Sequence, residues 1–388
     1  MKYFEVIIMT EYEGQLSFDY SFIDKSTNQV EKADDSSETV ITNPFDPAKI
    51  DIIQKPLTID LLIKRLKEKE INLLTDFQRR GGLWDDGQQS RLIESLIIRI
   101  PLPAFYFDGS NDNNWLIVDG LQRLTTLKRF FIDQELRLHN MEYVTQFEGL
   151  TYDQLPRHIQ RRIEETQIIA FVINEGTPEE VKYNIFKRIN TGGVPLTPQE
   201  IRHALNQGVA ANFLTKLAES REFLQATCHS IKSDRMDDRD FVLRFLAFTM
   251  TPYQFYIPDL EHFLNLSMGY LNRKSDQELV ELEARFKRAM VNSIEIFGDD
   301  AFRRRYNLND NRKQINKALF DTWSVNLGNL DDEQSKKAIR RSELIKEKFI
   351  ELMKDKNFDS AISQGTGDPR RVLYRFSKIE KLLKEVLA

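Results

Sequence analysis

The sequence predicts an α+β protein in which a mixed α/β part, ending near residue 205, is followed by an all-helical part. In the first part, short apolar runs of strand type alternate with helical patterns. After it, apolar residues recur at helical spacing almost to the end of the chain. The 388 residues exceed what one small core needs, and they contain no internal repeat. We therefore expect two domains, 1–205 and 206–388.

Local signals justify the individual elements. Thr58 is expected to cap a helix over 59–66. Thr197, Pro198 and Glu200 form the capping box of a later helix. The other elements expected in the first part are helices over 88–98, 121–133 and 178–189 and strands over 104–107, 115–118 and 167–174. The helical segments expected in the second part are 208–226, 238–250, 259–271, 275–297, 313–327, 331–355 and 369–387.

The composition is that of a soluble globular protein without disulfides. Hydrophobic residues make up 41% and charged residues 30% of the chain, and Cys228 is the only cysteine. The longest apolar stretch, 92–107, is interrupted by Glu94, Arg99 and two prolines. The N-terminus shows no signal-peptide pattern. We therefore expect a cytoplasmic protein without a membrane span.

The net charge of −5 and the pI of about 5.8 argue against a protein that passively coats DNA. Any DNA contact must come from local basic patches. Arginine and lysine clusters with aromatic neighbours lie at 303–305, 336–341 and 370–375. Each cluster is either a DNA contact or a solvated helix face.

The most informative motif follows the apolar run 115–118. The residues after this run read Asp119-Gly120-Leu121-Gln122-Arg123 and continue into a helical pattern, so we expect a strand, a tight turn and a helix. Asp119, Gln122 and Arg123 then lie at the helix N-terminus, which suits an anion or a polarised water. The alternative is that Asp119 only caps the helix, with Gln122 and Arg123 on the surface.

Four sequence blocks together carry a family resemblance. They are Phe77-Gln78-Arg79-Arg80 with Trp84, Leu92 to Pro103, Val118 to Leu127, and Phe186 to Arg202. In this order and spacing they resemble the N-terminal domain of GmrSD-type restriction enzymes, also known as domain of unknown function 262. The resemblance covers about residues 55–205. It implies a fold of the ParB/sulfiredoxin type for the first domain, which would be the catalytic one, and leaves the helical domain a DNA-contacting or structural role.

The resemblance also implies a defence function. Members of this family act on foreign phage DNA, including DNA with glucosylated hydroxymethylcytosine, and some relatives hydrolyse nucleoside triphosphates at the corresponding site. The family signature is Asp-Gly-Gln-Gln-Arg, and Leu121 here replaces the first glutamine. If that amide contacts a ligand, the ligand or the chemistry of this chain differs from that of the family. If that glutamine only packs against neighbouring residues, the ligand and the chemistry of this chain are the same as in the family.

Many relatives carry a C-terminal His-Asn-His nuclease domain, which we do not expect in this chain. None of its five histidines lies beyond His262. A stand-alone member must damage its target by itself, which favours base excision from modified phage DNA.

Three bonds are candidate targets. No P-loop sequence is present, so phosphoanhydride hydrolysis would use Arg79, Arg80 and Arg123 as its charge clamp. Phosphodiester cleavage would need a metal held by clustered carboxylates, for which Asp85 and Asp86 would have to join Asp119. That grouping is speculative, and we assign no metal ligands.

Hydrolysis of the N-glycosidic bond needs fewer catalytic groups than phosphodiester cleavage. Asp119 would orient a water and stabilise an oxocarbenium-like transition state, and Gln122 would hold the water or the flipped base. Arg123 or Arg79 would grip a phosphate. Trp84, Phe77 and Tyr106 are candidates for stacking on the base, although Phe77 and Tyr106 favour core packing. This reaction requires no cofactor.

The competing hypothesis is a sensor or restriction component that hydrolyses GTP, ATP or CTP with magnesium and drives a separate nuclease. A purely binding adaptor is a third hypothesis. Modified phage DNA is the expected partner, and a homo-oligomer is left open.

The remaining candidates are binding residues. Asn190, Gly192 and Gly193 form either a backbone nest for phosphate or a helix C-cap. Arg188 and Arg202 flank this turn and are expected to line one groove. Residues assigned to substrate or phosphate binding are Gln78, Arg79, Arg80, Trp84, Gly120, Arg188, Asn190, Gly192 and Gly193.

Overall fold

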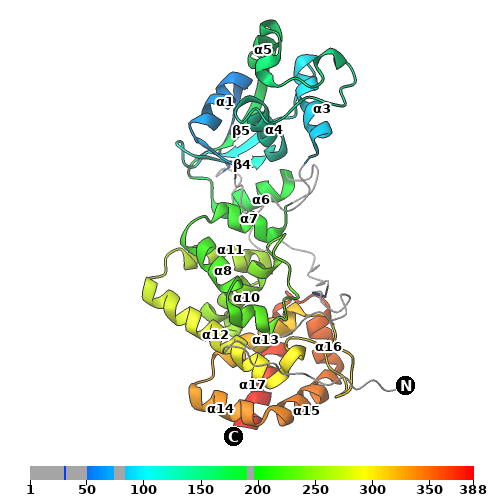
Figure 1. Ribbon diagram of the computed structural model, residues 1–388. Coiled ribbons are helices and arrows are strands. Elements are labelled where there is room, and N and C mark those ends of the chain that lie inside the picture. The colour runs from blue at the N-terminus through cyan, green and yellow to red at the C-terminus, as the bar shows by residue number, and fades with distance from the viewer. Residues whose placement is uncertain (1–29, 32–49, 74–83, 190–195) are drawn as a thin grey trace, which may run out of the picture.

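The computed structural model describes residues 30–31, 50–73, 84–189 and 196–388. The molecule is elongated, with a β-sheet and its helices at one end and a stack of helices extending to the other (Figure 1). This arrangement confirms the α+β prediction. The domain boundary between residues 205 and 206 stays a prediction.

The sheet has five strands in the order β1-β5-β3-β4-β2. They are β1 (Ile52–Thr58), β2 (Ile71–Asn72), β3 (Phe105–Asp108), β4 (Trp115–Asp119) and β5 (Gln167–Ile173). β3 and β4 are antiparallel, while β2 with β4 and β3 with β5 are parallel. Tyr106 lies opposite Asp119, and the register shifts directly after Tyr106. The last residue of β4 therefore lies opposite the second residue of β3.

Two core clusters pack helices against the sheet. One core cluster joins the sheet to α1, α3, α4 and α5, and Trp115 and Ile117 of β4 belong to it. A second, smaller cluster contains Val118 of β4 with α6 and α7. The helices of this part are α1 (Ile59–Lys67), α3 (Asp86–Ile97), α4 (Leu121–Phe131), α5 (Arg157–Glu164), α6 (Glu179–Ile189) and α7 (Pro198–Leu205), with short 3-10 turns at Thr145–Phe147 and Tyr152–Gln154.

The helix starts follow the sequence signals. Thr58 accepts a hydrogen bond from the backbone N–H of Leu61 at 3.3 Å. Thr197 and Glu200 form the expected capping box, with Pro198 at the first helical position. The caps fix where α1 leaves β1 and where α7 begins.

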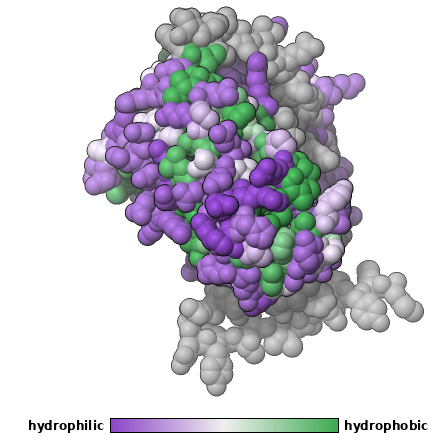
Figure 2. All heavy atoms as spheres, turned by 90° about the horizontal axis from the view of Figure 1, so that it is seen from above, coloured by the Kyte–Doolittle hydropathy of each residue, from purple (hydrophilic) through white to green (hydrophobic). Residues whose placement is uncertain are grey.

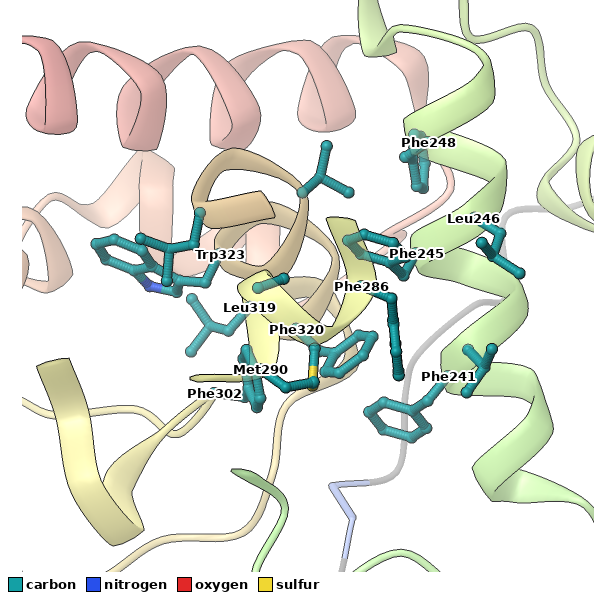
Figure 3. Packing of buried hydrophobic residues seen from close by; sticks show 14 of the residues in the cluster. Phe241, Phe245, Leu246, Phe248, Phe286, Met290, Phe302, Leu319, Phe320 and Trp323 are labelled. Carbon is teal, nitrogen blue, oxygen red and sulfur yellow. The ribbon is translucent and has the colours of Figure 1, made fainter. Parts of the chain in front are cut away.

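The helical part is built around aromatic residues. Phe241, Phe245, Phe286, Phe320 and Trp323 come from three helices and pack into one cluster (Figure 3). The elements of this part are α8 (Val209–Ala218), α9 (Arg221–Ala226), α10 (Asp237–Met250), α11 (Leu260–Leu271), α12 (Asp276–Phe297), α13 (Lys317–Gly328), α14 (Asp332–Arg340), α15 (Ser342–Met353), α16 (Lys356–Ser363) and α17 (Pro369–Leu387), with 3-10 turns at Tyr253–Phe255 and Gly298–Asp300. Two expected segments, 208–226 and 331–355, are each divided into two helices.

One arginine in each of two basic clusters, Arg303 and Arg375, corrects the sequence interpretation. Arg303 is 1% exposed and donates to the hydroxyl of Ser230, and Arg375 is fully buried. Burial of these guanidinium groups means that neither can contact DNA. None of the helices in the described part of the chain combines the length and the apolarity that a membrane span requires.

Candidate functional site

Asp119 is the last residue of β4, and α4 begins two residues later. Gly120 is the N-cap of α4, in the left-handed region with φ 104°, and it offers no side chain to the helix. Asp119 therefore does not cap the helix, and the alternative in which it only does so is wrong. Its carboxylate lies where the strand meets the helix N-terminus, as the sequence predicted.

Gly120 is required at this turn for two reasons. Its positive φ is costly for any residue with a Cβ. A Cβ added here would also lie 2.5 Å from the Cδ1 atom of Phe105. The turn is thus pressed against the core, which holds Asp119 in place.

Arg123 fixes the carboxylate. Its guanidinium donates to Oδ2 of Asp119 at 2.8 Å, to the carbonyl of Ala104 at 3.1 Å and to the carbonyl of Pro103. It also lies over the ring of Phe105, 4.4 Å from the ring centre. The guanidinium thus connects Asp119 to the segment before β3. They favour a role in positioning Asp119 over direct contact with a phosphate.

Burial opposes the charges of this pair. It raises the pKa of Asp119, although the attraction of Arg123 and the backbone N–H of Gly120 oppose the shift. It likewise lowers the pKa of Arg123, against the attraction of Asp119. The side chain of Asp119 nevertheless keeps 25% of its surface exposed. A half-buried carboxylate that solvent can still reach is typical of an acid–base or electrostatic centre.

Gln122 connects α4 to the start of α3. Its Oε1 accepts a hydrogen bond from the backbone N–H of Trp84 at 3.2 Å. The carbonyl of Trp84 accepts from Nε2 of Gln89 at 2.7 Å. Arg129 of α4 completes the connection by donating to Gln89 at 2.7 Å. Gln122 and the half-buried Trp84 are therefore brought together, as the proposed site requires.

Asp85 and Asp86 do not join Asp119. Asp85 is the N-cap of α3 and forms a capping box with Gln88. Asp86 pairs with Arg129 at 2.9 Å. Both carboxylates are used in these contacts at the start of α3, so the speculative metal grouping is wrong. Among the described residues there is no group of three or more His, Cys, Asp or Glu side chains that could hold a metal ion.

Leu121, which departs from the family signature, packs against the core of the α/β part. Its side chain is partly buried.

Six candidate residues lie outside the described residues, namely Gln78, Arg79, Arg80, Asn190, Gly192 and Gly193. The described residues that flank them lie close to β4. β2 pairs with β4, and Trp84 is bound to Gln122 of α4. Leu196 packs in the core cluster that contains Val118, the residue before Asp119. Arg188 is exposed in the last turn of α6, which packs in the same cluster.

Arg202 does not line a groove with Arg188. It is 1% exposed and donates to Asp240 of α10 at 2.8 Å and to Glu261 of α11. Tyr183 of α6 donates to the same glutamate at 2.7 Å. Arg202 therefore joins the α6–α7 region to the helical part, and the expectation of a shared groove is wrong.

Glu94 and Tyr106 make contacts within the α/β part. Glu94 is 3% exposed and accepts hydrogen bonds from three consecutive backbone N–H groups, those of residues 142–144. Burial opposes its ionisation, but these donors outweigh it and lower its pKa. Tyr106 stacks on Phe171 at 4.9 Å within the sheet, which agrees with core packing.

Sequence reasoning missed the backbone part of the site. The carbonyls of Pro103 and Ala104 hold Arg123, and the only signal was the Pro-Leu-Pro sequence that ends α3 and turns the chain toward β3. A proline pair keeps its segment extended, which leaves its carbonyls free to accept.

The fold and the site define an α+β domain whose candidate centre is a strand–glycine–helix turn that carries a buried carboxylate–guanidinium pair. Residues 61–206 match the family model of the GmrSD restriction endonuclease N-terminal domain. This part of the chain is thus similar to that domain, as the four sequence blocks predicted, and the match is consistent with a restriction-like role. No curated protein matches the chain.

Proposed function

We propose that this protein is a hydrolase of restriction-like defence that acts on phage DNA with modified bases and excises such a base. The family match supports the restriction-like role on DNA. The observation that carries the excision chemistry is the carboxylate of Asp119, which is half-buried, partly exposed and fixed at 2.8 Å from Arg123. One positioned carboxylate is enough for N-glycosidic hydrolysis, whereas metal-dependent phosphodiester cleavage needs several.

In the proposed reaction, Asp119 orients a water and stabilises the positive charge that develops on the sugar. The bond between C1′ and the base nitrogen breaks, the water oxygen bonds to C1′, and the base leaves with a proton from the water. Arg123 is a positioning residue, because its donors hold Asp119 and the backbone before β3. Desolvation at the site strengthens the field of the carboxylate.

Recognition requires the target base to leave the stack. This costs a few kcal/mol, which an aromatic ring offsets by stacking on the base. Trp84 is our candidate for that ring, since Gln122 holds its backbone beside α4. Arg188, exposed at the end of α6, is our candidate for a phosphate contact. The other binding residues assigned from the sequence stay predictions.

The test compares the parent protein with Asp119→Asn on modified and unmodified phage DNA, with and without a nucleoside triphosphate. Asparagine keeps the size of the side chain and an acceptor for Arg123 but removes the charge. We expect the parent to produce alkali-labile abasic sites in modified DNA without triphosphate, and Asp119→Asn to lose about 10²-fold or more in rate. Asp112→Asn, an exposed aspartate in the β3–β4 turn, is the matched control.

Two outcomes contradict the proposal. Strands of modified DNA that stay intact after alkali exclude base excision. Release of inorganic phosphate from GTP, ATP or CTP that is abolished by Asp119→Asn would instead favour the nucleotide-hydrolysing sensor.

A further inference from the structure

The backbone of Trp84 is held by glutamine side chains from two helices. Its N–H donates to Oε1 of Gln122 on α4 at 3.2 Å. Its carbonyl accepts from Nε2 of Gln89 on α3 at 2.7 Å. α3 and α4 lie side by side at the sheet end of the molecule (Figure 1). The backbone of Trp84 is therefore fixed relative to α4, the helix that begins directly after the Asp119 turn.

Gln89 is a buried polar side chain whose orientation is fixed by its partners. It is 5% exposed. Its Oε1 accepts from Nη1 of Arg129 at 2.7 Å, while its Nε2 donates to Trp84. Turning this amide over would place donor against donor and acceptor against acceptor. The same nitrogen of Arg129 donates to Asp86 at 2.9 Å, which holds the guanidinium in place. Because a buried amide is costly unless its hydrogen bonds are made, these contacts stabilise Gln89 where it lies.

Gln89 occupies a helix position that often carries an apolar residue. Trp84 directly precedes the N-cap Asp85, and Gln89 is the fourth residue of α3. A hydrophobic residue before an N-cap often packs on an apolar side chain at this fourth position. Gln89 binds the backbone of Trp84 instead of covering its ring with an apolar side chain. Trp84 is partly exposed, and within the described part of the chain no other ring and no cation stacks on its indole.

We propose that Gln89 and Arg129 are positioning residues that hold Trp84 for stacking on an unpaired DNA base. This proposal rests on the proposed function, in which a modified base leaves the duplex. Arg129 orients Gln89, and Gln89 together with Gln122 holds the backbone of Trp84. A ring that is held before binding loses less conformational entropy when a base stacks on it. The substrate class that fits is DNA whose target base is extruded or unpaired, because only such a base offers its face to the indole.

Tryptophan fluorescence gives a readout that is specific to Trp84. The other two tryptophans, Trp115 and Trp323, are each 1% exposed, so quenching by acrylamide reports mainly on Trp84. Gln89→Met keeps the length of the side chain but removes the amide, and we expect Trp84 to be quenched more strongly than in the parent. Gln89→Glu keeps an acceptor for Arg129 and removes only the donor to Trp84, so it should show the same increase.

Binding is measured in full-length Asp119→Asn, so that excision does not intervene, with a duplex oligonucleotide that carries one glucosylated hydroxymethylcytosine. We expect Gln89→Met and Gln89→Glu to weaken binding about 3- to 10-fold, as the loss of one hydrogen bond does. Arg129→Met should weaken it in the same direction. In a Trp84→Leu background the Gln89 substitutions should change binding by less than about 2-fold, because a positioning residue has no effect once the ring it positions is gone.

Excision by the protein with Asp119 intact gives a second readout. Gln89→Met should raise KM more than it lowers kcat, because Arg123 still holds Asp119. A purely structural role for Gln89 would instead lower the fraction of active protein, which reduces kcat and leaves KM unchanged.

Gln160→Met is the matched control and should bind the oligonucleotide as the parent does. Gln160 accepts from Arg157 at 3.2 Å and donates to the carbonyl of Tyr152 at 3.0 Å, so it makes the same two kinds of contact elsewhere in the α/β part.

The proposal is overturned if the oligonucleotide does not bind, or if the Gln89 variants and Arg129→Met bind it as the parent does. It is equally overturned if the Gln89 substitutions weaken binding as much in Trp84→Leu, or if Gln160→Met weakens binding to the same extent. The expected binding effects without any abasic product would refute the excision chemistry alone and support the role of Gln89 and Arg129.

Discussion

Asp119 and Arg123 form an ion pair that holds the Asp119 carboxylate in a partly buried position. The side chain of Arg123 is 10% exposed, and its guanidinium has three oxygen partners, one of them Asp119. Its fixed direction leaves the carboxylate little freedom to rotate away. Such preorganisation lets a carboxylate stabilise a developing positive charge without rearranging during the reaction.

Gly120 gives the first prediction. Gly120→Ala should lower the free energy of unfolding by about 2–4 kcal/mol, because the positive φ and the contact with Phe105 both penalise a Cβ. Gly149→Ala is the matched control, since Gly149 also has a positive φ, 79°, but nothing lies within 4 Å of its added Cβ. Urea unfolding measures both. Equal losses in the two variants would contradict the close packing described for Gly120.

At single residues, sequence patterns predicted where Asp119 lies in the fold but not the contacts of the charged side chains. The strand, the Asp-Gly pair and the helical pattern were enough to place Asp119 correctly. The partners of Glu94 and Arg202 could not be predicted, because they come from residues 142–144 and from two helices of the other part of the chain. Long-range partners of charged side chains leave no local periodic signal.

Among the elements, α10 and α13 share a buried ionic ladder. Asp240 of α10 accepts from Lys317 of α13 at 2.9 Å, and one turn further along both helices Arg244 pairs with Asp321 at 2.6 Å. Arg202 of α7 donates to the same Asp240. Each charge in the ladder is compensated by a neighbouring helix, so the ladder fixes the relative positions of α7, α10 and α13.

This ladder gives the second prediction. Asp240→Asn should lower the free energy of unfolding at neutral pH by about 3–5 kcal/mol, because it leaves two buried cations under-compensated. Burial opposes the ionisation of Asp240, but Lys317, Arg202 and Arg244 outweigh it and lower its pKa. Its contribution is therefore present above the unfolded pKa of about 3.9 and is lost as pH falls through the lower folded value.

Chemical unfolding of the parent and Asp240→Asn across a pH series checks this. The difference between them should be constant above about pH 5 and should shrink below about pH 4. Glu343→Gln, an exposed carboxylate whose side chain is 75% exposed, is the control and should change stability little. A difference that does not depend on pH would contradict the role given to the Asp240 charge.

Elements were predictable where capping residues and periodicity agreed. The starts of α1 and α7 follow from Thr58 and Thr197, whose caps are present in the structure. The division of the expected 331–355 segment could not be predicted, because no proline or glycine marks the break at Arg341. The turn there depends on tertiary contacts, including a hydrogen bond from Arg341 to the carbonyl of Val386.

On the scale of the whole molecule, the acidic chain must present local positive charge to bind DNA. Lys187 and Arg188 are both exposed in the last turn of α6, near the end of β4. The face seen from above, which carries α1, α3 and α5, consists largely of hydrophilic residues (Figure 2). The proposed function therefore implies a small number of phosphate contacts close to Asp119.

The third prediction concerns these contacts. The double variant Lys187→Gln and Arg188→Gln should bind DNA more weakly, and the slope of log K against log salt should become about 1–2 units less negative. Lys336→Gln, whose side chain is 68% exposed on α14 at the other end of the chain, is the control. Filter binding or fluorescence anisotropy across a salt series measures both. An unchanged slope would exclude α6 from the DNA interface.

The general architecture was predictable at this scale, since strand and helix periods separate the two parts clearly. The packing of the α6–α7 region onto the helical part was not, because it depends on Arg202, Glu261 and Tyr183 meeting across more than fifty residues of sequence. The sequence predicted Arg202 as a groove residue because a turn with arginines on both sides resembles a phosphate site.

The most direct test of the account is the mass of a modified oligonucleotide after incubation with the protein. We predict that the oligonucleotide loses the modified base and gains a hydroxyl at C1′, that the free base appears in equal amount, and that Asp119→Asn abolishes both changes. An oligonucleotide of unchanged mass, or one cut at a phosphodiester bond with all its bases in place, would contradict the assignment of Asp119 as the centre of base excision.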